Sequence, residues 1–116
     1  MYVAYVVVTV ATIVINLWAA VADFARAEIV LANAAAVGIS PSWIPLLGLL
    51  KAAGAVGLLL GLVGVPFVGG AAALGLVLFF VGAVALHVRQ RVFGNIGFPG
   101  VFLAFAVASL VLGAAG

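Results

Sequence analysis

The chain contains no cysteine and almost no charge. Among its 116 residues, two are acidic, four are basic and one is a histidine. Without cysteine, the chain supplies no thiolate nucleophile, thiol–disulfide relay or iron–sulfur ligand. A single histidine excludes bis-histidine haem ligation within one chain, and four basic residues form no patch for a phosphate backbone. We therefore expect no metal site and no nucleic-acid partner.

What the chain does contain is hydrophobic residues. They make up 70% of the sequence, charged residues make up 5%, and the mean hydropathy is +1.60. This composition predicts an integral membrane protein. With about 20 residues per transmembrane helix, residues 1–116 are expected to form a single all-α domain without a soluble catalytic part. The predicted spans are residues 2–22, 44–63, 68–87 and 98–113. No catalytic constellation is present, so we do not expect an enzyme.

A polar connection separates the first two spans. Residues 23–44 interrupt the apolar sequence with charged and polar side chains. Within this connection, residues 29–37 are rich in alanine and aliphatic residues and are followed by Gly38, which predicts a short helix near the membrane surface. The expected fold is therefore an integral membrane four-helix bundle with a short interfacial helix between spans 1 and 2.

Glycine is regularly spaced in the second span. Four glycines fall within an arc of about 80° on a helical wheel; they are Gly54, Gly57, Gly61 and Gly64. Small residues on one face let another helix backbone approach closely, which favours helix packing in lipid. We therefore predict that the second span lies at the centre of the bundle. The third span has a similar strip, formed by Ala71, Gly75 and Gly82.

The polar residues of the first span also share one face. They recur every three, four or seven positions and lie within about 80° of one another on a helical wheel. They are Tyr2, Tyr5, Thr9, Thr12, Asn16 and Asp23. This stripe is predicted to face the other helices, with Ala19 and Ala20 continuing it as small packing positions.

Three arginines set the predicted orientation in the membrane. Arg26 follows the first span, and Arg89 and Arg91 follow the third. The positive-inside rule places these two connections in the cytoplasm and both ends of the chain outside. The same arginines are expected to contact lipid headgroups.

This topology brings four polar residues into one half of the membrane: Asn16, Asp23, Lys51 and His87. Each has a simple structural interpretation. Lys51 can extend to the interface or pair with Asp23, His87 can be an interfacial histidine rather than a proton carrier, and Asn16 can form an interhelical hydrogen bond. The alternative hypothesis is a combined ligand-binding site made by all four.

Several stretches of the sequence carry a family resemblance. They are GLLKAAGAVGLLLGL in the second span, FFVGAVALHVR in the third, GFPGVFLAFAVASLVL in the fourth and AVADFARAEIVLANAAAVGISPSW before them. Through these stretches the chain resembles the DoxX-like family of small bacterial membrane proteins, in its actinobacterial form. The resemblance implies four membrane helices in a bacterial inner membrane and a link to membrane redox complexes or oxidative-stress defence. Members often resemble one another in carrying an acidic residue in the second helix, where this chain has Lys51.

Three classes of function follow. The resemblance favours an accessory or quinone- or lipophile-binding subunit of a membrane redox or oxidative-stress complex. The cofactor is unknown, with a quinone as one candidate, because lysine, histidine and asparagine can donate hydrogen bonds to its carbonyls. The second class is a non-catalytic membrane protein that assembles through its glycine seams. A small transporter ranks last, since neither Asp23 nor Glu28 lies deep within a span.

Overall fold

The computed structural model describes residues 2–25, 27–65, 67–91, 93–94 and 96–115, and this part of the chain contains five α-helices and no strand. Four of the helices are long: α1 (Tyr2–Phe24), α3 (Ile44–Leu62), α4 (Val68–Arg89) and α5 (Gly97–Ala115). The short helix α2 (Glu28–Ala36) and a 3₁₀ turn, η1 (Pro41–Trp43), connect α1 to α3. The all-α bundle with a short helix between its first two spans is therefore confirmed.

Each long helix is apolar and long enough to cross a membrane. Helices of 19 to 23 residues are about 29 to 35 Å long, close to the thickness of a bilayer core of about 30 Å. Their outer faces carry exposed aliphatic side chains, such as Val7, Val14 and Leu78, which suit contact with lipid. The chain is thus a multi-pass membrane protein.

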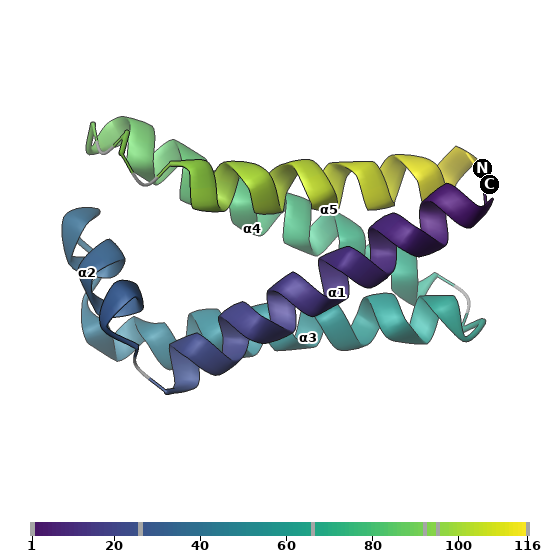
Figure 1. Cartoon of the computed structure of the whole chain (residues 1–116), viewed down its shortest axis with the longest axis horizontal. Helices are drawn as coiled ribbons and strands as arrows, with labels where there is room; N and C mark the ends of the chain where they lie inside the picture. The colour runs from purple at the N-terminus through teal and green to yellow at the C-terminus, as the bar shows by residue number, and fades with distance from the viewer. Residues whose placement is uncertain (1, 26, 66, 92, 95, 116) are drawn as a thin grey trace.

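The four long helices form a ring. Helix α1 packs against α3 and α5, and α4 packs against the same two helices. Seen from the side in Figure 1, the pair α1 and α3 and the pair α4 and α5 are close together near the two termini and diverge toward the end where α2 lies. Because α3 has two main neighbours, as the other three helices do, the prediction that it forms the centre of the bundle is wrong.

The glycine face of α3 packs against α4. A Cβ atom added at Gly57 would lie 2.6 Å from Cβ of Ala72, and one added at Gly61 would lie 2.6 Å from Cα of Gly69. Gly54 lies over Leu76 in the same way. Only glycine permits these helices to approach so closely, which increases van der Waals contact where lipid supplies no hydrophobic drive.

Gly64, Gly75 and Gly82 are not part of this contact. Within the described residues, nothing lies within 4 Å of a Cβ added at any of them. Gly64 has φ +99°, and its N–H donates to the carbonyl of Gly61, so it ends α3 as a left-handed glycine. Gly75 and Gly82 are exposed positions of α4. The predicted packing role is therefore not found for these three within the bundle.

The polar stripe of α1 faces inward over most of its length. Thr9, Thr12, Asn16 and Asp23 are buried, whereas Tyr2 is exposed near the start of the helix. The hydroxyl oxygens of Thr9 and Ser109 are 2.7 Å apart and join α1 to α5. The hydroxyl of Thr12 donates to the carbonyl of Val8 at 2.7 Å and approaches that of Phe105 at 3.4 Å. Hydrogen bonds thus support packing along the α1–α5 seam.

Candidate ligand-binding cavity

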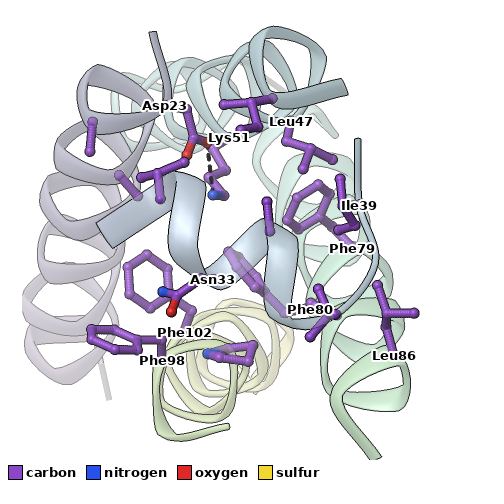
Figure 2. A pocket seen from close by; sticks show the side chains of 18 of the residues that line it. Asp23, Asn33, Ile39, Leu47, Lys51, Phe79, Phe80, Leu86, Phe98 and Phe102 are labelled. Carbon is purple, nitrogen blue, oxygen red and sulfur yellow. Dashed lines mark hydrogen bonds and ion pairs between the residues drawn. The ribbon is translucent and has the colours of Figure 1, made fainter. Parts of the chain in front are cut away.

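A cavity of about 360 Å³ lies between the diverging helix pairs, and residues of all five helices line it. This volume is within the usual range for small-molecule sites, about 300 to 1,000 Å³. Figure 2 shows α2 crossing the front of the cavity, with the four long helices around it. The cavity exists because the helix pairs separate at this end and α2 fills only part of the space between them.

Most of the lining is aliphatic or aromatic. The ring centroids of Phe79 and Phe80 are 4.9 Å apart in an edge-to-face arrangement, and those of Phe80 and Phe102 of α5 are 5.2 Å apart. Aliphatic side chains from α2, α3, α4 and the connection before η1 complete the apolar surface; they include Val30, Ile39, Leu47 and Leu86. Such a surface favours an apolar or amphiphilic occupant.

An ion pair forms part of the wall. Nζ of Lys51 on α3 donates to Oδ2 of Asp23 on α1 at 2.9 Å, and the two side chains are 15% and 5% exposed. Gly48 permits this approach, since a Cβ added there would lie 2.9 Å from Cβ of Asp23. The ammonium also lies 5.7 Å from the centre of the Phe79 ring. The structural interpretation of Lys51 as the partner of Asp23 therefore agrees with the geometry, and the pair is electrically neutral.

His87 reaches the cavity from the last turn of α4. It is 8% exposed, and its Nδ1 lies 2.8 Å from the carbonyl oxygen of Ala83. Because a carbonyl oxygen only accepts, Nδ1 carries the proton in this contact. In the neutral ring, Nε2 is then an acceptor, and no partner for it is found among the described residues.

Asn33 is a lining residue that the sequence did not suggest. It lies on α2, and its side chain points into the cavity toward Phe98 and Phe102 (Figure 2). Its amide has no hydrogen bond to the described part of the chain. A sequence pattern that could have indicated Asn33 is helical spacing. One side of the predicted helix carries four residues that line the cavity: Val30, Asn33, Ala34 and Val37.

Asn16 is buried but does not line the cavity. Its Nδ2 donates to the carbonyl of Thr12 at 2.9 Å within α1, so the expected interhelical hydrogen bond is not found among the described residues. Its Oδ1 is buried without a partner in the described chain. The physical reason is local: an amide in a helix reaches the carbonyl four residues earlier more readily than it reaches a neighbouring helix. The cavity thus brings together Asp23, Lys51 and His87 but not Asn16.

The basic residues lie toward the same end of the bundle. Arg89 ends α4, and Arg91 follows it with φ +56°; both are exposed. Arg26, the third residue of the orientation argument, lies outside the described residues. The described residues contain no group of three or more histidine, cysteine, aspartate or glutamate side chains placed to hold a metal ion.

Comparison with known proteins identifies one family. The sequence model of the DoxX-like family matches residues 7–109. This match covers α2, α3 and α4 completely and most of α1 and α5, and it includes every residue of the cavity named above. No curated protein and no solved structure matches the chain.

Proposed function

Since this chain belongs to the DoxX-like family, we propose that it is an accessory membrane subunit that binds a quinone or another lipophile in the cavity beside α2. The observation that carries the proposal is the cavity itself. It combines an apolar lining with an ion pair and a histidine at its walls. Ligand sites typically have this composition, in which a large apolar surface provides affinity and a few polar groups fix orientation.

The cavity opens at the surface of the bundle, which would face lipid in a membrane. Trp18 of α1 and Phe98 of α5 line it, yet they are 60% and 45% exposed. Helices α1 and α5 diverge at this end of the molecule (Figure 1). A lipophile can therefore move from the membrane into the cavity without crossing water. A quinone would suit the polar wall, because Lys51 has three N–H donors and uses one on Asp23.

The redox part of the proposal rests on the family and on this chemistry together. The chain has no cysteine for electron transfer, so a redox role would depend on the bound molecule and on a partner protein. We propose that the partner is a membrane redox or oxidative-stress enzyme, for which this chain binds and positions the lipophile.

The orientation is part of the same proposal. The cavity end carries Arg89 and Arg91, and the positive-inside rule favours the cytoplasm for this end. The inner membrane of a bacterium, with both ends of the chain outside, is the location that this rule and the family favour.

Self-association is a second candidate. Ala71 and Gly75 are exposed on α4 and do not line the cavity, whereas Gly82, the third residue of the predicted strip, does line it. Small residues on a lipid-facing surface allow a second helix to approach closely. A homo- or hetero-oligomer through this surface would be compatible with a lipophile in the cavity.

The test is mass spectrometry of apolar molecules that co-purify with the protein from its native membrane in a mild detergent. Wild type is compared with Lys51→Leu and His87→Ala, and Arg91→Leu is the control because Arg91 does not line the cavity. We expect a near-stoichiometric quinone or other lipophile in wild type and control, reduced in the two cavity variants. Bulk lipid alone in all four samples would contradict lipophile binding and favour a structural subunit.

A further inference from the structure

The polar side chains of the cavity retain both hydrogen-bond donors and hydrogen-bond acceptors that could contact a ligand. Two N–H groups of Lys51, the amide of Asn33 and Nε2 of His87 have no partner among the described residues. From this pattern, which rests on the proposed lipophile site, we infer that the ligand is an uncharged amphiphile with a hydroxyl group that donates to Nε2 of His87. Of the two redox forms of a quinone, only the reduced quinol has such a hydroxyl group.

The charges around the cavity favour an uncharged ligand. Asp23 and Lys51 neutralise each other at 2.9 Å, and His87 is held to a main-chain carbonyl rather than to an acid. An anionic or cationic ligand would bring an uncompensated charge into a largely apolar cavity, which is unfavourable. A neutral molecule adds no such cost and leaves the ion pair intact.

The hydrogen bond that His87 already makes favours a ligand with a hydroxyl group. Its Nδ1 is committed to the carbonyl of Ala83 at 2.8 Å, which fixes the proton on that nitrogen in the neutral ring. Nε2 is then an acceptor, and a ligand hydroxyl is its natural partner. A carbonyl or ether oxygen at the same place would face another acceptor and form no hydrogen bond. The N–H groups of Lys51 and Asn33 can donate to a second oxygen of the ligand.

The opening of the cavity determines where the apolar tail lies. Trp18 and Phe98 are both lining residues and both exposed. Lys51 and His87 are 15% and 8% exposed, so the hydroxyl end would lie inside the bundle and the tail would leave past Trp18 and Phe98, between α1 and α5. Trp18 is then adjacent to the tail and can report binding.

The experiment uses the fluorescence of Trp18. The chain has two tryptophans, so Trp43→Phe leaves Trp18 alone; Trp43 does not line the cavity. The probes are a 4-alkylphenol with a brominated chain, its methyl ether, and the benzoate and benzylamine with the same chain, added to the protein in neutral phospholipid vesicles. Saturable quenching of Trp18 measures binding, and each probe is repeated with His87→Phe in the same background.

We expect the phenol to bind about tenfold more tightly than its ether, corresponding to one hydrogen bond of about 1.4 kcal/mol. Both charged probes should bind more weakly than the phenol. In His87→Phe the preference for phenol over ether should disappear while ether binding is retained, and this retention also shows that the variant is folded. Each probe partitions into the vesicle lipid to the same extent with either protein, so this partition does not affect the comparison between the protein with His87 and His87→Phe.

Other results would overturn the inference. Equal, saturable binding of phenol and ether to the protein with His87 would leave lipophile binding intact but refute the hydroxyl contact. Tightest binding of the benzoate or the benzylamine would refute the neutral ligand. A preference for phenol that persists in His87→Phe would refute the role of His87. No saturable quenching by any probe would refute the proposed lipophile site together with this inference.

Discussion

At the residue scale, the Asp23–Lys51 ion pair is a mostly buried electrostatic contact between two helices. The two side chains are mostly buried, and they meet at 2.9 Å beside an aromatic ring. Removing one partner of a buried pair is costly, because the other charge remains without compensation in a medium that solvates it poorly. The pair therefore links α1 to α3 at the end where the helix pairs diverge.

Replacing Lys51 tests this link. We predict that Lys51→Leu lowers the free energy of unfolding in bicelles by about 2–3 kcal/mol, because Asp23 loses its partner. Arg91→Leu should change it by less than about 0.5 kcal/mol, since Arg91 is exposed. Adding Asp23→Asn to Lys51→Leu should restore part of the loss. Small and equal effects of Lys51→Leu and Arg91→Leu would argue against a stabilising pair.

The sequence allowed part of this site to be predicted. Placing the ends of the spans in order brings Asp23, Lys51 and His87 to one end of any antiparallel bundle, and the structure places them around one cavity. The spacing of Asn33 predicts its side of α2, but its contribution depends on how α2 crosses the diverging pairs, a tertiary arrangement that this spacing does not specify. The position of the Asn16 amide depends on competition between two hydrogen-bond acceptors, which spacing cannot resolve.

At the element scale, the contact between α3 and α4 depends on glycine at specific positions. Gly61 and Gly69 bring the two backbones together near the α3–α4 turn, whereas Gly75 faces outward. Inserting a methyl group into a packed interface causes strain of about 1–3 kcal/mol. The same insertion at an open helical position reduces backbone freedom in the unfolded chain and favours the helix by up to about 1 kcal/mol.

Two alanine substitutions are therefore expected to change the free energy of unfolding in opposite directions. Gly61→Ala should lower the free energy of unfolding by about 1–3 kcal/mol, since its Cβ would meet the backbone of Gly69. Gly75→Ala should leave stability unchanged or raise it. Both variants are compared by unfolding in mixed detergent micelles. A larger loss of unfolding free energy in Gly75→Ala than in Gly61→Ala would contradict the role of Gly61 in the contact between α3 and α4.

Helical periodicity predicted which glycines share a face but not which of them touch a neighbour. Gly54, Gly57, Gly61 and Gly64 share an arc, yet Gly64 lies two residues beyond the end of α3 and forms the turn instead. Where a helix ends and which neighbour its face meets depend on the connection that follows. The same limit explains why α3 was expected at the centre of the bundle and lies in a ring.

At the scale of the whole molecule, the connection containing α2 and the turn between α3 and α4 lie at opposite ends of the bundle (Figure 1). The proposed orientation places the α2 end in the cytoplasm. Because the chain has no cysteine of its own, a single introduced cysteine reports the side of the membrane on which it lies.

Cysteine labelling tests the orientation. Ser42 at the α2 end and Val65 in the α3–α4 turn are both exposed. A membrane-impermeant maleimide added to the outside of intact spheroplasts should label Val65→Cys but not Ser42→Cys, and permeabilised membranes should show both. Labelling of Ser42→Cys alone in intact spheroplasts would reverse the orientation without affecting the fold.

The central claim is that the space between the diverging helix pairs holds a lipophile. Ala83 lines this space, whereas Ala85 lies on the opposite, exposed face of the same helix. The most direct measurement is the molar ratio of co-purified lipophile to protein for wild type, Ala83→Phe and Ala85→Phe, determined by native mass spectrometry. We predict a ratio near one for wild type and Ala85→Phe, and a large loss for folded Ala83→Phe, because its ring occupies the cavity. Equal ratios in Ala83→Phe and Ala85→Phe, or no bound lipophile in wild type, would contradict the claim.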